Sequence, residues 1–230
     1  MDYAVSSYTP TLQALLKPRS QRAPTLDQNP RILIVSQPAT PNYPAIPNTT
    51  IEAAIVMSIA GRSDNSIVLD DEDGTVAAVV KGMETHDWVH LACHGVQNPD
   101  NPTQSAFILY DGVLTLNTLM SKSLPNAELA VLSACQTAKG DTKLSNEVVH
   151  LAAGMLNAGY KSVIGTMWSI SDDSAPKLME VFYREMMAQV DAGGELQPAY
   201  ALHEAVKALR KECNEMHNRW DWLPFVHFGL

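Results

Sequence analysis

Two side chains with the chemistry of a nucleophile and of a proton carrier stand where predicted strands end. Cys135 follows the apolar run Leu129–Ala134, and His94 follows the mostly apolar run Trp88–Cys93. Such runs are typical of strands buried on both faces, and the carboxyl ends of parallel strands meet at one edge of a sheet. A thiolate attacks carbonyl carbons, and a neighbouring imidazole lowers the pKa of the thiol and later protonates the leaving amine. The pattern therefore predicts a cysteine–histidine dyad for acyl transfer.

Main-chain groups beside these residues can stabilise the oxyanion that such an attack creates. Gly95 directly follows the histidine, and a glycine permits a close backbone approach that a Cβ would hinder. Backbone N–H groups are common oxyanion donors. We therefore expect the amides of Gly95 and Cys135 to form the oxyanion hole.

Each cysteine also has a purely structural interpretation. Free cysteines are among the most buried residues, so Cys135 taken by itself is typical of a core position. Its place at a strand end, together with His94, favours the catalytic interpretation. Cys93 alternates with His94 along its strand, and Cys213 falls on the apolar face of a predicted helix. We expect Cys93 and Cys213 to be core residues.

Histidines recur every four residues at positions 86, 90 and 94, which on a helix would form a metal-binding stripe. The aromatic Trp88 and β-branched Val89 favour a strand instead, on which His90 and His94 would lie about 13 Å apart. We therefore expect no metal ion and no other cofactor. We interpret His90 as a hydrogen-bonded interior residue or as a support of the site.

Short apolar runs alternate along the chain with segments of helical period. We expect strands over 31–36, 67–69, 88–93, 129–134, 162–168 and 224–228. A β-hairpin is expected over 106–116, because Asp111-Gly112 suits a turn with positive φ. Helices are expected over 48–60 and 75–83 and from about 146, 174 and 198. This alternation predicts a doubly wound α/β sandwich of about six mostly parallel strands with helices on both faces.

Two details of these helices can be checked directly. In the first helix, Ile51, Ile55, Val56 and Ile59 are the apolar residues expected to face the core. Asn48 or Thr49 is expected to cap that helix, and Ser174 is expected to cap the helix that follows it.

Composition narrows the class of protein. Apolar residues make up 46% of the chain and charged residues 18%, and the net charge is −9. No Lys/Arg run is present, which argues against a nucleic-acid partner. The chain has neither a signal-peptide pattern nor an apolar run of about 18 residues, so we expect a cytoplasmic protein without a membrane partner. The first thirty residues are rich in Pro, Ser and Thr. We therefore expect an arm or linker over 1–30 and one domain over 31–230.

Several blocks of the sequence together resemble the CHAT domain family. They are HLACHG (90–95), AELAVLSACQTAKG (127–140), LAAGMLNAGYKSVIGTMWSISDD (151–173), MEVFYREM (179–186) and WLPFVHFG (222–229). CHAT proteins are caspase-like peptidases related to separase and often joined to tetratricopeptide repeats. In caspases the catalytic histidine lies about 50 residues before the cysteine, and here the separation is about 40.

The resemblance implies a caspase–haemoglobinase fold and a dyad formed by His94 and Cys135. It also implies that Trp168, Ser169 and Asp172 shape the substrate cleft, with Asp172 reading a basic side chain of the substrate. Asp172 can equally cap the helix that begins near Ser174, and Trp168 can simply pack in the core.

The resulting hypothesis is a cysteine endopeptidase that cuts a specific protein substrate, such as a gasdermin-like effector of cell death or defence. No 34-residue repeat occurs in this chain, so a tetratricopeptide-repeat regulator or activator would belong to a longer protein. The loop 136–147 is a candidate for autocleavage near Lys139 or Lys143, although a simple surface loop is the alternative. A catalytically silent signalling or adaptor module of the same fold is the alternative function. A different thiol enzyme, such as an amidase, would need a small closed pocket.

Overall fold

Six strands of the described part of the chain form one sheet in the order β2-β1-β3-β7-β8-β9. A computed structural model describes residues 4–9, 29–64, 66–96, 98, 100–133, 147–168, 173–212 and 219–229. The strands of this sheet are β1 (Ile32–Ser36), β2 (Ile67–Asp70), β3 (Trp88–Ala92), β7 (Leu129–Leu132), β8 (Ser162–Thr166) and β9 (Phe225–Gly229). All of these neighbours pair in parallel except β8 and β9, which pair antiparallel.

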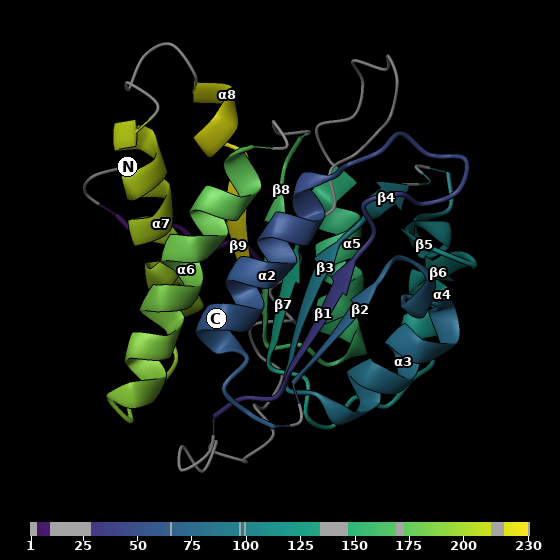
Figure 1. Cartoon of the computed structure of the whole chain (residues 1–230), viewed down its shortest axis with the longest axis horizontal. Coiled ribbons are helices and arrows are strands. Elements are labelled where there is room, and N and C mark those ends of the chain that lie inside the picture. Colours follow the sequence, from purple (N-terminus) through teal and green to yellow (C-terminus); the bar gives the residue numbers. More distant parts are fainter. Residues whose placement is uncertain are drawn as a thin grey trace.

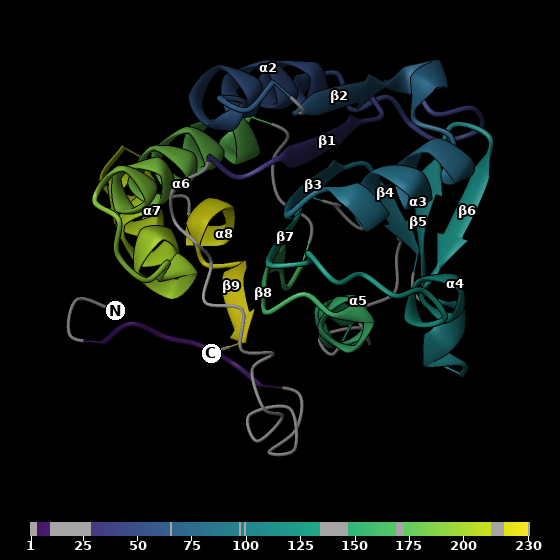
Figure 2. The same cartoon turned by 90° about the horizontal axis from the view of Figure 1, so that it is seen from below.

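Helices cover both faces of the sheet (Figures 1 and 2). The helices are α2 (Asn48–Ala60), α3 (Val76–Thr85), α4 (Leu116–Met120), α5 (Glu147–Ala158), α6 (Ser174–Asp191), α7 (Pro198–Glu212) and α8 (Arg219–Trp222). Short 3₁₀ turns occupy Asp71–Asp73 and Pro102–Gln104. One buried cluster joins the sheet to α2, α6 and α7, and the other joins it to α3 and α5. The predicted sandwich of mostly parallel strands with helices on both faces is confirmed.

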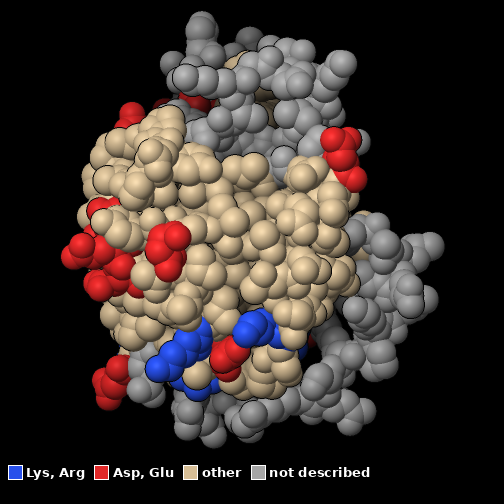
Figure 3. Space-filling model, turned by 90° about the vertical axis from the view of Figure 1, so that its right-hand side faces the viewer, with Lys and Arg blue, Asp and Glu red and all other residues tan. Residues whose placement is uncertain are grey.

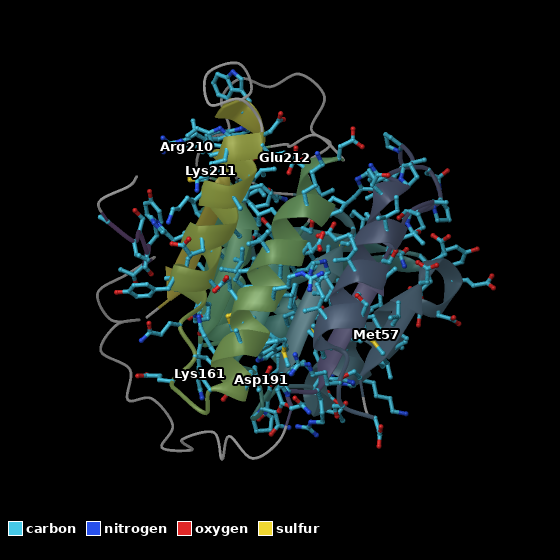
Figure 4. The ribbon with its side chains drawn as sticks, turned by 60° about the vertical axis from the view of Figure 1, so that its left-hand side comes forward. Met57, Lys161, Asp191, Arg210, Lys211 and Glu212 are labelled. Carbon is cyan, nitrogen blue, oxygen red and sulfur yellow. The ribbon has the colours of Figure 1, made fainter. Side chains whose placement is uncertain are left out.

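The two opposite faces of each buried strand explain this layering. Along β3, Trp88 packs in the cluster beneath α2 and α6, whereas Val89 and Leu91 pack in the cluster beneath α3 and α5. Successive side chains of a strand point to opposite faces, so a run that is apolar at every position can support two helix layers. Figure 4 shows α7, α6 and α2 side by side in one of these layers.

A second, smaller sheet begins at the predicted catalytic histidine. Strand β4 (His94–Val96) pairs antiparallel with β5 (Ala106–Leu109), which pairs with β6 (Gly112–Thr115). The hairpin was expected, but its extension by β4 was not. Figure 3 views the molecule from this side: the centre of the described surface lacks charged side chains, which gather toward its edges. Val96, Val113 and Met120 are exposed there, so the surface that continues from His94 along β4 is partly apolar.

Residues 4–9 lie beside β9. The N–H of Tyr8 donates to the carbonyl of His227 (2.8 Å), and the N–H of Gly229 donates to the carbonyl of Tyr8 (3.0 Å). The Tyr8 ring lies 6.0 Å from the ring of Phe228. An edge strand presents unpaired backbone groups, and these contacts satisfy part of that edge. The division between an arm and a domain at residue 30 stays a prediction.

Two cap predictions were wrong for a shared reason. Pro47 occupies the N-cap of α2, so Asn48 lies in the first turn, and Asp173 occupies the N-cap of α6. The side-chain amide of Asn48 donates to the carboxylate of Asp173 at 2.7 Å. Both side chains therefore bridge the starts of two neighbouring helices, which a local cap rule does not anticipate.

Candidate active site

The strands that precede the two predicted catalytic residues in the sequence are neighbours in the sheet. Strands β3 and β7 pair in parallel, with Leu91 opposite Leu132. His94 comes three residues after Leu91, and Cys135 comes three residues after Leu132. Paired strands lie about 4.8 Å apart, so this register directs both chain segments to the same end of the sheet. Cys135 itself lies outside the described residues, and Ser133 is the last described residue before it.

His94 is fully buried and held on two sides by the loop between β1 and α2. Its Nε2 lies 2.8 Å from the carbonyl oxygen of Pro44. Because a carbonyl can only accept, Nε2 carries the proton, and Nδ1 is the basic nitrogen of the neutral ring. The ring of Tyr43 stacks on the imidazole, with centroids 5.3 Å apart and planes at 28°. The imidazole is thus held in one orientation and one tautomer.

The shape of that loop follows from its sequence. It contains a proline at positions 38, 41, 44 and 47, and proline fixes φ near −65°. Its start is attached to the sheet, because the N–H of Gln37 donates to the carbonyl of Ala92 (2.9 Å). Within it, the N–H of Ile46 donates to the carbonyl of Pro38 (2.9 Å). These restraints place the Pro44 carbonyl beside His94 with little backbone freedom.

The neighbouring thiol, Cys93, is a core residue as predicted. It has no exposed surface, and it packs in the cluster beneath α3 and α5. Burial raises the pKa of its thiol to about 12. Because the thiolate is the reactive form, Cys93 is chemically inert near neutral pH. Cys213, the other predicted core cysteine, lies outside the described residues.

Of the three predicted cleft residues, the structure describes Trp168, while Ser169 and Asp172 lie outside the described residues. Trp168 follows β8 and packs edge-on against Trp220, with ring centroids 5.6 Å apart. Its Nε1 donates to the carbonyl of Trp220 at 3.4 Å. Gly95, the predicted oxyanion donor, lies in β4 opposite Phe107.

Trp168 also lines a cavity of about 240 Å³ between α7, β9 and residues 4–8. Its walls are mainly apolar, as at Leu202 and Phe225, and Lys207 and Arg210 also border it. Arg210, in the last turn of α7 (Figure 4), lies over the ring of Trp222 at 5.8 Å. No carboxylate lines this cavity among the described residues. The described lining of the cavity therefore offers no anionic group that could bind a basic side chain of a substrate.

A buried polar cluster beneath the site was only partly foreseen. His90 is a buried, hydrogen-bonded residue, as interpreted from the sequence. Its partner Glu52 was missed, because α2 was expected to bury Ile51. Instead Ile51 is 54% exposed and Glu52 only 2%. The sequence signal that could have revealed this is the glutamate itself, the only charged residue of the helix, flanked by Ile51 and Ala53.

The sequence model of the CHAT domain matches residues 1–230. The chain belongs to the CHAT domain family. No curated protein sequence matches it. The predicted family membership is confirmed.

Solved structures of caspase-like peptidases share the fold. The Arg-specific cysteine proteinase gingipain R aligns with a TM-score of 0.57 at 13% identity, over 86% of this chain and 46% of the gingipain chain. A complex of the pro- and mature domains of Porphyromonas gingivalis RgpB aligns with the same TM-score. The Saccharomyces cerevisiae separase–securin complex aligns with a TM-score of 0.58 at 14% identity, over 88% of this chain and 12% of that chain. This CHAT chain thus spans less than half the length of each of these relatives. The described residues contain no helix long and apolar enough to span a membrane.

Proposed function

We propose that this CHAT domain is a cysteine endopeptidase in which Cys135 is the nucleophile and His94 is its acid–base partner. The observation that carries the proposal is the β3–β7 register, in which Leu91 pairs with Leu132. Each proposed catalytic residue follows its member of that pair by three positions. The burial and fixed orientation of His94 support it as well.

The proposed reaction begins with proton transfer from the Cys135 thiol to Nδ1 of His94. The thiolate attacks the carbonyl carbon of the scissile peptide bond, and the amides of Gly95 and Cys135 stabilise the oxyanion. The imidazolium then gives its proton to the departing amine, which leaves a thioester on Cys135. Water, deprotonated by His94, hydrolyses that thioester, releases the acid product and restores the thiol.

The Pro44 carbonyl has a defined part in these steps. It accepts from Nε2 of His94 in both the neutral and the protonated states of the ring. The same ring nitrogen, Nδ1, therefore receives the proton and gives it back. Tyr43 holds the plane of the ring while its charge changes. This division of roles keeps the proton acceptor aimed at one place throughout the cycle.

The substrate is proposed to be a protein cut at few sites. Family resemblance supports a gasdermin-like effector of cell death or defence in the cytoplasm, with a tetratricopeptide-repeat region of a longer protein as activator. Trp168, Ser169 and Asp172 are proposed to border the substrate cleft, with Asp172 accepting a basic side chain. Gingipain R, one of the structural relatives, is named as Arg-specific, which agrees with that choice.

A reactivity-based experiment tests the proposal. The wild-type chain, Cys135→Ala and His94→Ala are each incubated with a peptide library and with a peptide carrying an acyloxymethyl ketone. Peptide mapping by mass spectrometry locates the label. We expect labelling at Cys135 and peptide cleavage by the wild type, and loss of both in the two variants.

Cys93→Ala serves as the matched control, because Cys93 is a second cysteine in the same chain with a buried, protonated thiol. Cleavage and labelling should persist in this variant. If the wild type neither reacts at Cys135 nor cleaves any peptide, even with a tetratricopeptide-repeat activator added, the peptidase proposal is wrong. The catalytically silent adaptor function would then replace it.

A further inference from the structure

Four buried polar side chains from separate parts of the chain meet beneath the carboxyl end of β7. They are Glu52 on α2, His90 on β3, Ser133 just after β7 and Tyr183 on α6. Each is at most 5% exposed. The Oγ of Ser133 donates to Oε2 of Glu52 at 3.0 Å, and Nδ1 of His90 lies 3.1 Å from the hydroxyl of Tyr183. We call these four residues the buried relay.

The centre of the relay is a close polar contact between His90 and Glu52. Nε2 of His90 lies 3.1 Å from Oε1 of Glu52. These two atoms do not meet hydrogen-bond geometry with each other, and neither has another hydrogen-bond partner among the described residues. The contact therefore acts through charge and proximity, while Oε2 of Glu52 makes the well-formed bond to Ser133.

The protons of the buried relay can be assigned one after another, starting from the hydroxyl of Tyr183. Burial, and then the charge of Glu52, raise the pKa of Tyr183 well above its ordinary value of 10, so its hydroxyl stays protonated. That hydroxyl can donate to Nδ1 of His90, which leaves the proton of the neutral ring on Nε2, facing Glu52. Oε1 of Glu52 then faces the N–H of His90 at 3.1 Å without a well-formed hydrogen bond, and Oε2 accepts from Ser133. The Ser133 hydroxyl is thereby attached to a carboxylate that has partners on both sides.

Such an arrangement is costly for stability alone. Moving a carboxylate out of water is strongly unfavourable, and well-packed apolar residues in the place of buried charged groups are often at least as stable. The surrounding cluster is apolar, with Ala53, Val56 and Val131 among its members. The polar residues are therefore better explained by the geometry they fix than by the stability they add. The atom they fix nearest the candidate site is the Oγ of Ser133.

We propose that Glu52 and His90 are positioning residues that hold the Cys135 thiol in register with His94. The proposal rests on the proposed peptidase function. Glu52 fixes Ser133, two residues before Cys135, so two peptide units, about 7 Å of chain, separate the fixed point from the nucleophile. Displacement of a reacting group by about 1 Å can lower a rate about 100-fold, so an anchor this close affects the reaction rate.

The test compares four variants of the full chain. Ser133→Ala removes the donor, Ser133→Thr keeps an oxygen at the same position, and Glu52→Gln keeps the shape without the charge. Ser162→Ala is the matched control, because Ser162 is also 5% exposed and bonds a buried histidine, at 2.9 Å, at the start of β8. The rate of Cys135 alkylation by iodoacetamide at pH 7 is followed by peptide mapping. For a cleaved peptide, kcat and KM are measured separately, and thermal unfolding gives the stability of each variant.

We expect Ser133→Ala to lower the alkylation rate and kcat about 10- to 100-fold with KM nearly unchanged. Ser133→Thr should restore both to within about threefold. Glu52→Gln should fall between these, because a bond to a neutral acceptor is roughly half as strong as one to a carboxylate. Ser162→Ala should lower Tm about as much as Ser133→Ala without changing either rate.

Three outcomes would overturn the proposal. These are equal rates in Ser133→Ala and Ser162→Ala, wild-type reactivity in Glu52→Gln, or rates that fall only in proportion to stability. Failure of the peptidase function gives a different result, since no peptide would then be cleaved by any variant. The alkylation rates would in that case still show whether Ser133 and Glu52 position the thiol.

Discussion

The stacking of Tyr43 on His94 makes a quantitative prediction about catalysis. The rings lie 5.3 Å apart at 28°, and Tyr43 is half-buried in the loop that also supplies the Pro44 carbonyl. An aromatic pair of this kind contributes about 0.5–1.5 kcal/mol beyond its buried area. Removing the Tyr43 ring should therefore lower the ratio of correctly oriented to misoriented His94 by roughly two- to thirteenfold. Tyr43→Ala is expected to reduce kcat/KM measurably, by at most that factor, while Tyr43→Phe should stay near the wild type.

The assay is hydrolysis of a peptide found by library screening, with the alkylation rate of Cys135 as an independent measure of thiol reactivity. Thermal unfolding of each variant separates orientation from loss of structure. The reasoning would be refuted by an unchanged kcat/KM in Tyr43→Ala. It would be refuted equally by a Tyr43→Phe variant as impaired as Tyr43→Ala, since the ring is retained there.

Three further predictions concern buried groups. Cys93→Ala should lower the free energy of unfolding by about 1 kcal/mol and leave peptide cleavage unchanged, as urea unfolding and kinetics would show; impaired cleavage would contradict its inert, buried state. His90→Ala should cost about 3–5 kcal/mol in urea unfolding, because it leaves the buried carboxylate of Glu52 without the polar ring that faces it at 3.1 Å; a cost under about 1 kcal/mol would contradict this. Burial lowers the pKa of His227 from 6.5 to about 4, so the unfolded chain binds a proton between these values while the folded chain does not. Stability should thus fall by up to about 3 kcal/mol as the pH drops from 6.5 to 4, and this part of the loss should vanish in His227→Gln; an equal loss in that variant would contradict it.

The sheet was predictable because its strands share a simple sequence pattern. Runs such as Ile32–Ser36 and Trp88–Ala92 are apolar at nearly every position, as parallel strands covered on both faces must be. The place of His94 at the end of such a run could be predicted from this pattern. Its contacts with Tyr43 and Pro44 could not, because these residues belong to an irregular loop far away in the sequence.

The buried face of α2 was not predictable from its pattern. Periodicity places isoleucines inward and carboxylates outward, yet Ile51 is exposed and Glu52 is buried. The helix takes this orientation because Ser133 and His90, from two separate strands, both contact Glu52. A rule based on hydrophobicity along one helix contains no information about partners brought together by the sheet. Sequence reasoning thus found the catalytic candidates and the buried His90, but neither Glu52 nor the loop residues Tyr43 and Pro44.

The loop that orients His94 determines which substitutions can disturb the site. The partner of Nε2 is a main-chain oxygen, so no side-chain replacement at position 44 can delete it. An alanine scan would miss this contact, and only changes that alter the path of the proline-containing loop would disturb it.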